Sequence, residues 1–201
     1  LLQNAEHPRP DIAVVYLNRV TDAQEEKGRN AFIESYRRYR PALAHQFYVV
    51  NKGFAPEHLP IQYELFSEFA PRFIQVTDEG YDLTAYQTAA AFIEEPVVLF
   101  LNTYSEPLHE GWLEKLHDAF RSPGVGLAEL AKPRDVHQSI GPTGFMIETE
   151  RFRRLAASPQ LTGQGEAHRF EEGLASLTRM VEAEKLTTTV VWKSAFSLLQ
   201  N

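Results

Sequence analysis

The sequence predicts a single α/β domain with a mainly parallel sheet that helices cover on both faces, and three observations carry this prediction. Apolar runs such as residues 12–17 (IAVVYL) and 97–101 (VVLFL) are typical of strands that are buried on both faces. Amphipathic stretches with helical spacing alternate with these runs. The 201 residues are 43% hydrophobic and 23% charged, which is enough apolar material for one sizeable core.

The first half of the chain repeats a strand that is followed by a helix. We expect an extended lead at residues 1–10, strands at 12–17, 46–50, 73–76 and 97–101, and helices at 28–39, 84–93 and 111–120. In the helix at 28–39, Phe32, Tyr36 and Tyr39 share one face. Right-handed crossovers bring the carboxyl ends of parallel strands to one edge of a sheet, so the polar residues that follow these strands should meet there.

The second half is less regular but belongs to the same domain. We expect strands at 124–129, 144–147 and 187–192, helices at 150–157 and 170–184, and a polar loop at 159–167. The sequence contains no internal repeat and no low-complexity segment. A single domain that spans residues 1–201 is therefore the predicted organisation.

Composition excludes several classes of function. A net charge of -7 argues against binding nucleic acid or a charged membrane surface, because both depend on concentrated Lys and Arg. The chain has no cysteine, which rules out disulfides and thiolate metal sites and fits a reducing compartment. The apolar runs are far shorter than the roughly 20 residues that span a bilayer, and no signal peptide is visible. We therefore expect a cytoplasmic protein without a transmembrane segment.

Motifs of several enzyme classes are absent from the sequence. The seven histidines are scattered, including His137 two residues after Asp135, and no HExxH spacing occurs. The sequence also lacks the GxSxG, GxxxxGK[ST] and GxGxxG motifs. Zinc-dependent, serine-hydrolase, P-loop and dinucleotide-binding functions therefore have no support from motifs.

The first group of candidate site residues lies in residues 78–86 (DEGYDLTAY), between a strand and a helix. Asp78 or Asp82 can accept hydrogen bonds from a ribose or a base, as acids at strand ends do in nucleotide-binding folds. The alternative is that Asp82 caps the helix that follows. The sequence leaves both open, because one residue can do both.

The second group is the pentapeptide 102–106 (NTYSE), which follows the apolar run at 97–101. Two carboxylates in such a turn would hold a divalent ion against two phosphates. This turn offers the neutral carbonyl of Asn102, the phenol of Tyr104 and the single carboxylate of Glu106. It predicts at most a weak metal site at Asn102 and Glu106, and the alternative is an ordinary polar strand end before Pro107.

The third group is Glu171 and Glu172, which stand at the start of the predicted helix 170–184. Acids are favoured at helix starts by the macrodipole, whatever the function. The functional alternative is that one of them is a general base, which takes a proton from an attacking hydroxyl.

Several segments, in this order, resemble nucleotide-sugar-dependent glycosyltransferases with the GT-A fold. They include IAVVYLNR, DEGYDLTAYQTAA, VVLFLNTYSEPLHEGWLEKL, GFMIETERFRRL and FEEGLASLTRMV. The resemblance covers nearly the whole chain and is closest to the family-two branch, which includes rhamnosyltransferase-like proteins of bacterial surface polysaccharides. It implies a GT-A (nucleotide-diphospho-sugar transferase) fold and an enzyme that transfers a sugar from a nucleotide-sugar donor to a glycan or similar acceptor, with inversion.

The resemblance also implies roles for individual residues. Asn18 and Arg19 would lie near the base and Asp82 near the nucleoside, while Asn51 stands where an acid is common. Asn102 and Tyr104 fall where the family has its DxD motif, which holds manganese or magnesium. Neither residue is an acid, so the motif is degenerate and the metal is in doubt.

On the acceptor side, Glu171 is the best match for the base, with Glu172 next to it. Two alternatives remain for the degenerate motif. Cations such as Arg19 or Lys52 can neutralise the leaving diphosphate, or the chain can be a non-catalytic binding module.

Overall fold

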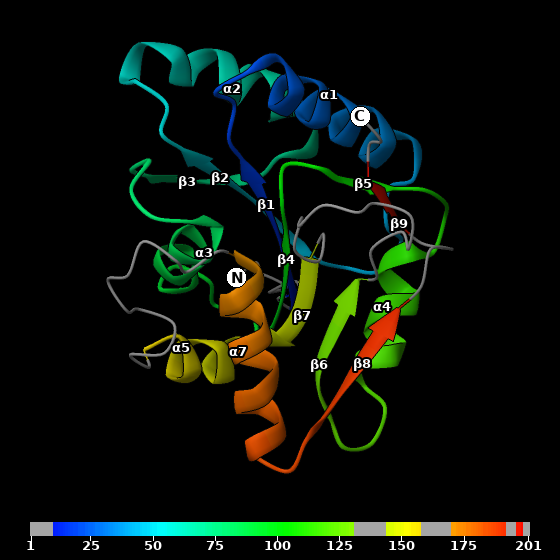
Figure 1. Ribbon diagram of the computed structural model, residues 1–201. Helices are drawn as coiled ribbons and strands as arrows, with labels where there is room; N and C mark the ends of the chain where they lie inside the picture. Colours follow the sequence, from blue (N-terminus) through cyan, green and yellow to red (C-terminus); the bar gives the residue numbers. More distant parts are fainter. Residues whose placement is uncertain (1–9, 131–143, 158–169, 192–195, 199–201) are drawn as a thin grey trace, which may run out of the picture.

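The computed structural model describes residues 10–130, 144–157, 170–191 and 196–198. The predicted lead (except Pro10) and the predicted polar loop at 159–167 lie outside the described residues. Within them, a seven-stranded sheet has the strand order β3-β2-β1-β4-β7-β6-β8 (Figure 1). Its strands are β1 (Ile12–Asn18), β2 (Gln46–Lys52), β3 (Arg72–Val76), β4 (Val97–Leu101), β6 (Val125–Leu130), β7 (Gly144–Glu148) and β8 (Thr187–Val191).

Strand direction confirms the predicted α/β class with a mainly parallel sheet. Strands β1 to β4 pair in parallel. Strand β7 runs antiparallel to both of its neighbours, β4 and β6, and β8 is parallel to β6. All strands of this seven-stranded sheet except β7 therefore point the same way, and their carboxyl ends lie at one edge.

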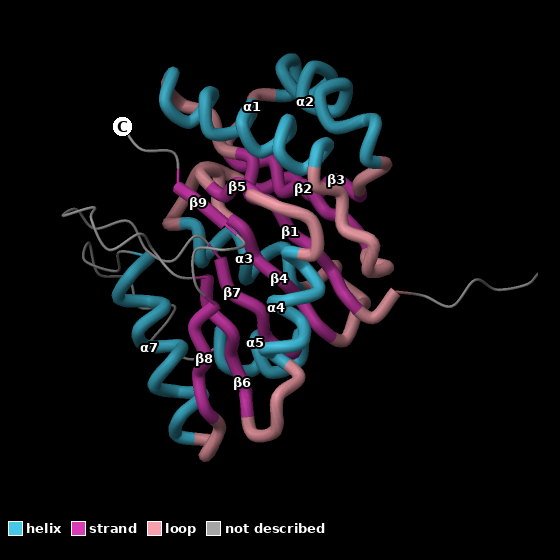
Figure 2. Tube along the Cα trace, turned by 90° about the vertical axis from the view of Figure 1, so that its right-hand side faces the viewer, coloured by secondary structure: helices cyan, strands magenta, loops and turns pink. Residues whose placement is uncertain are grey.

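Helices cover both faces of the sheet and bury two apolar clusters. One cluster contains Phe32 and Tyr36 from α1 (Ala23–Arg38) and Trp112 from α4 (Trp112–Phe120). The other contains Tyr86 from α3 (Asp82–Ala90), Phe152 from α5 (Thr149–Ala156) and Leu177 from α7 (Phe170–Ala183). In Figure 2, α1 and α2 lie close together over one face. The helices are α1 (Ala23–Arg38), α2 (Leu59–Phe66), α3 (Asp82–Ala90), α4 (Trp112–Phe120), α5 (Thr149–Ala156) and α7 (Phe170–Ala183), with short 3-10 turns at Pro56–His58 and Ser67–Phe69. No helix in the described part of the chain is apolar over a length that would cross a membrane.

Three features differ from the predicted elements. Helix α1 begins at Ala23, five residues earlier than predicted, because Asp22 caps it by accepting a hydrogen bond from the Glu25 amide at 2.8 Å. Helix α2 was not predicted. Strands β5 (Ser105–Pro107) and β9 (Phe196–Leu198) form a small antiparallel sheet close to α1, which was not predicted either (Figure 2).

Candidate functional site

The polar residues that follow the strands meet at the carboxyl edge of the sheet, as the sequence predicted. Asn18 and Asn51 are register partners at the ends of β1 and β2. Arg19 Nε, after β1, donates to Asp78 Oδ1, after β3, at 3.0 Å. Thr103 Oγ1, after β4, donates to the Leu17 carbonyl oxygen at 2.9 Å. We call this edge the rim: it comprises residues 18–19, 51–52, 78–82 and 102–106.

The base of the rim is a buried network of amides. Asn18 Nδ2 donates to Asn51 Oδ1 at 2.8 Å and to Gln62 Oε1 at 3.0 Å. Arg29, on α1, also donates to Gln62 Oε1, at 3.4 Å. Asn18 and Asn51 are 0% and 1% exposed, yet Asn18 Oδ1 and Asn51 Nδ2 have no hydrogen-bond partner among the described residues. Unpaired polar atoms at this depth are uncommon and call for a physical explanation.

A network of charges adjoins the amides. Besides its bond to Asp78, Arg19 donates to Glu25 Oε1 at 2.8 Å. The other oxygen of Glu25 accepts the amide and the hydroxyl of Thr21, both at 2.7 Å. The hydrogen bond from Arg19 lowers the pKa of Asp78. Asp78 is therefore an ionised partner of Arg19, and its carboxylate is already in use.

Lys52 and Asp82 form the third part of the rim. Lys52 Nζ donates to the Gly80 carbonyl oxygen at 2.7 Å, and burial lowers its pKa. Burial raises the pKa of Asp82, against the opposing effect of Lys52 and Arg19. Asp82 is half-buried and makes no hydrogen bond or ion pair with another described residue. Its carboxylate is therefore available to a ligand.

The idea that Asp82 caps α3 is wrong. Asp82 is the first residue inside the helix, and the cap position belongs to Tyr81, which makes no side-chain cap bond. An acid in the first turn still gains from the helix dipole. The ligand-binding role of Asp82 stays a prediction.

In the turn after β4, the polar groups are bonded to one another. Asn102 Oδ1 accepts the Tyr104 amide at 3.1 Å and the Ser105 hydroxyl at 3.2 Å. The Ser105 amide donates to the Asn102 carbonyl oxygen at 3.0 Å. Helix α1 presses on this turn at Gly28, where a Cβ atom would stand 2.9 Å from the Thr103 carbonyl oxygen. Asn102 therefore stabilises its own turn.

The same turn is a poor set of ligands for a hard divalent ion. Burial raises the pKa of the Tyr104 phenol, and Glu25 and Asp22 raise it further, so the phenol stays protonated at neutral pH. The Asn102 oxygen already accepts two hydrogen bonds, which leaves Glu106 as the one carboxylate of the turn. The described residues contain no group of three His, Asp or Glu side chains that could hold a metal. Manganese and magnesium prefer several carboxylate oxygens.

The start of α7 lies toward the rim. Thr178 donates to Glu129 Oε1 at 2.7 Å, while Val181, one turn later, packs against Gly126. The helix therefore runs antiparallel to β6, and its first turn, with Glu171 and Glu172, lies toward the carboxyl end of that strand. Their side chains are outside the described part of the structure, so their roles stay predictions.

Sequence reasoning missed three residues that join the networks at the rim from helices α1 and α2: Glu25, Arg29 and Gln62. Glu25 had a signal, since Asp22 followed three residues later by an acid is typical of a capped helix start. Arg29 and Gln62 had none, because they reach the rim from helices and depend on how those helices pack.

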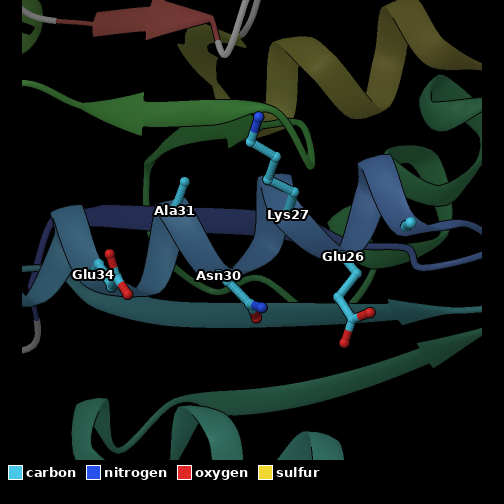
Figure 3. Close-up of a pocket in the computed structure, with 6 residues that line it drawn as sticks. Glu26, Lys27, Asn30, Ala31 and Glu34 are labelled. Carbon is cyan, nitrogen blue, oxygen red and sulfur yellow. The ribbon is translucent and has the colours of Figure 1, made fainter. Parts of the chain in front are cut away.

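Two surface hollows lie away from the rim residues. A hollow of about 470 Å³ follows the outer face of α1, where Lys27 and Ala31 point to one side of the helix and Glu26 and Asn30 to the other (Figure 3). It is lined by Ala23, Glu26, Lys27, Asn30, Ala31 and Glu34. A second hollow, of about 290 Å³, lies at the edge strand β3 beside Arg72 and Phe92. Neither is lined by a predicted site residue.

Comparison with solved structures identifies the fold. The chain superposes on TarS 1-349 from S. aureus in complex with UDP with a TM-score of 0.65 and 14% identity, covering 93% of this chain and 60% of that one. It spans 36% of a longer TarS chain. For the mannosyltransferase PcManGT from Pyrobaculum calidifontis, in complex with GDP-Man and Mn2+, the TM-score is 0.64 with 12% identity, over 94% of this chain and 56% of that one.

A third structure agrees with these two. Glucosyl-3-phosphoglycerate synthase from Mycobacterium tuberculosis, in complex with Mn2+, UDP and glucosyl-3-phosphoglycerate, gives a TM-score of 0.62 with 12% identity, over 96% of this chain and 73% of that one. No model of a protein family and no curated sequence matches the chain. The shared architecture confirms the GT-A fold, the fold of nucleotide-diphospho-sugar transferases.

Proposed function

We propose that the chain binds a nucleotide-sugar donor at the rim and transfers the sugar to a hydroxyl of a glycan or similar acceptor. One observation carries this proposal: in a GT-A fold, the rim gathers two cations, Arg19 and Lys52, beside the half-buried carboxylate of Asp82, which has no partner among the residues that the structure describes. Ligands of open α/β sheets bind at the carboxyl ends of the strands. A carboxylate there suits the hydroxyls of a ribose, and cations suit a diphosphate.

In this proposal Arg19 and Lys52 stabilise the negative charge of the leaving diphosphate. Positioned cations can supply this stabilisation without a metal. The Mn2+ in the PcManGT and glucosyl-3-phosphoglycerate synthase structures makes a metal plausible for the fold, but the 102–106 turn offers poor ligands for one. The predicted weak metal role of Asn102 and Glu106 is kept as a hypothesis to be tested with manganese.

Glu171 is the proposed general base, with Glu172 as the alternative. The base takes the proton of the acceptor hydroxyl, whose oxygen forms a bond with the anomeric carbon of the donor sugar. The bond between that carbon and the diphosphate oxygen breaks, and its electron pair stays on the diphosphate. Direct attack from the opposite side inverts the anomeric configuration.

Calorimetric titration with UDP-, GDP- and dTDP-sugars, with and without manganese, tests the binding part. At least one donor should bind, and manganese should change its Kd less than about twofold if cations replace the metal. No binding across the panel would remove the proposal. A large gain with manganese would instead restore the metal site.

The catalytic part is tested by comparing Glu171→Gln with Glu172→Gln. The variant that lacks the base should bind the donor normally and lose about 10²- to 10⁴-fold in turnover, and the other should stay near the wild type. Normal turnover in both variants would retire these residues as the base.

The second candidate function is a GT-A-like module that binds its ligand without turnover. The turn after β4 favours this function, because the side-chain oxygen of Asn102 is already bonded within the turn. The double substitution Asn102→Asp and Tyr104→Asp discriminates the two. If it brings metal-dependent donor hydrolysis, the turn is a decayed metal site in an otherwise competent enzyme; if it brings no metal binding, the module is the better description. A bacterial polysaccharide pathway and a cytoplasmic location remain predictions.

A further inference from the structure

Asn18 Oδ1 and Asn51 Nδ2, at the base of the rim, have no hydrogen-bond partner in the described part of the chain and form a pair of opposite polarity. Oδ1 only accepts hydrogen bonds and Nδ2 only donates them. They belong to side chains that are register partners and are joined by a 2.8 Å hydrogen bond through their other amide atoms. The free acceptor and the free donor therefore stand at the ends of two neighbouring strands.

Arg29 fixes which atom is the donor and which the acceptor. A guanidinium can only donate, so the Gln62 atom that faces Arg29 must be the oxygen, Oε1. Because that same oxygen faces Asn18, the Asn18 amide must present its nitrogen. The nitrogen in turn requires Asn51 to present its oxygen. Each amide orientation follows from the one before it, and the polarity of the free pair follows from Arg29.

A partly exposed ion pair lies at the carboxyl end of β2, next to the Asn18–Asn51 pair. Arg19 and Asp78 follow β1 and β3, which flank β2, so their ion pair crosses the carboxyl end of β2. Asp78 also packs on Gly53, where a Cβ atom would stand 2.8 Å from the Asp78 Cβ. The side chains of Arg19 and Asp78 are 31% and 49% exposed, and exposed ion pairs contribute little to stability. A nucleobase would reach these amides from this edge if an anionic ligand replaced Asp78 as the partner of Arg19.

We propose that Arg29, acting through Gln62, makes the rim select between two classes of nucleobase edge. Uracil, thymine and guanine carry a ring N–H donor next to a carbonyl acceptor. Cytosine and adenine carry a ring nitrogen acceptor next to an amino donor, which is the reverse order. A ligand held in one pose by its ribose and diphosphate can satisfy the Asn18–Asn51 pair with one class only. This inference rests on the proposed nucleotide binding and makes Arg29 a positioning residue.

The wild-type protein tests it by calorimetric titration with UDP, CDP, GDP and ADP. UDP and CDP, or GDP and ADP, should differ in Kd by about tenfold or more, the scale expected for an unpaired buried polar group. Equal Kd values for UDP and CDP, and for GDP and ADP, would overturn the inference while leaving nucleotide binding intact. Absence of all binding would overturn the proposed function and this inference with it.

Two pairs of variants test the role of Arg29 and Gln62. Gln62→Glu keeps an acceptor and should keep the base preference, whereas Gln62→Leu removes it and should bring the ratio of Kd values toward one. Arg29→Met should act like Gln62→Leu, and Arg38→Met, on the same helix, is the control. A purely structural role would weaken both nucleotides equally and leave the ratio unchanged, and that result would also overturn the inference. Thermal denaturation checks that each variant is folded.

Discussion

Two neighbouring parts of the rim use the same kind of residue in opposite ways. At the ends of β1 and β2, asparagine side chains bond to side chains of other segments, and two of their atoms find no partner within the described residues. In the turn after β4, Asn102 bonds to the backbone and hydroxyl two and three residues ahead. The Asn102 side chain stabilises the turn in which it stands. The unpaired amide atoms of Asn18 and Asn51 can still form hydrogen bonds with a ligand, so we expect ligand recognition at the ends of β1 and β2.

The contact between α1 and the turn after β4 gives the largest expected effect. In Gly28→Val the new side chain meets the Thr103 carbonyl and the Tyr104 ring, so the free energy of unfolding should fall by about 2–3 kcal/mol. Urea denaturation measures it. Ala31→Val, on the same helix and only partly buried, is the control and should cost less than about 1 kcal/mol. Equal losses would mean that this turn yields easily and is not a rigid part of the rim.

Asp82 should show the next largest effect, on binding. Asp82→Ala removes the free carboxylate and should raise the Kd for a bound nucleotide by about thirtyfold, the scale of a charge-assisted hydrogen bond. Asp118→Ala, which removes an exposed acid of α4 outside the rim, is the control for calorimetry. Unchanged binding in Asp82→Ala would move recognition away from this part of the rim.

Loss of the Asp82 carboxylate should weaken nucleotide binding but stabilise the fold at neutral pH. Burial raises the pKa of Asp82 above the ordinary value of an aspartate, so the folded state holds the proton more tightly than the unfolded state. Its contribution is most favourable below the unfolded pKa and is lost as pH rises through the folded pKa. Asp82→Asn should therefore melt at a slightly higher temperature than the wild type at pH 7, and this gain should vanish in acid.

Substitutions of Asn102 test whether the turn after β4 has a structural role or binds a ligand. Asn102→Ala removes the side-chain oxygen that accepts the Tyr104 amide and the Ser105 hydroxyl, and it should lower the free energy of unfolding by about 1–2 kcal/mol. Asn102→Asp keeps an acceptor oxygen and should lose less. If urea denaturation showed no loss for Asn102→Ala while nucleotide binding fell, the two parts of the rim would have the same role.

The ion pair between Arg19 and Asp78 should give the smallest effect. Both side chains are about a third or more exposed, so Asp78→Asn should change the free energy of unfolding by less than about 1 kcal/mol. Arg19 lowers the pKa of Asp78. The small stabilisation is therefore present above the unfolded pKa and lost as pH falls through the folded pKa.

The same variant also tests binding. Nucleotide affinity should rise in Asp78→Asn, because Arg19 is released. A fall in affinity would make Asp78 a ligand contact, as the sequence first suggested.

The sequence predicted most of the sheet because its central strands are continuous apolar runs, which are readable without tertiary context. It did not predict α2, since residues 59–66 are short and contain Pro60. Nor did it predict the direction of β7, because an apolar run does not encode which way its neighbour points. In the rim, the strand ends were predictable from topology alone. The contributions of Arg29 and Gln62 were not, since they depend on how two helices sit on one face.

The β5–β9 pair has a consequence for the order in which the molecule assembles. Asn18 and Asn51 are 33 positions apart, whereas Ser105 pairs with Leu198 across 93 positions. Pairings between distant residues cost more loop-closure entropy and tend to form later. When β1 has paired with β2 in a folding chain, Asn18 and Asn51 are already side by side. The β5–β9 pair is expected to form later, because β9 lies near the end of this sequence.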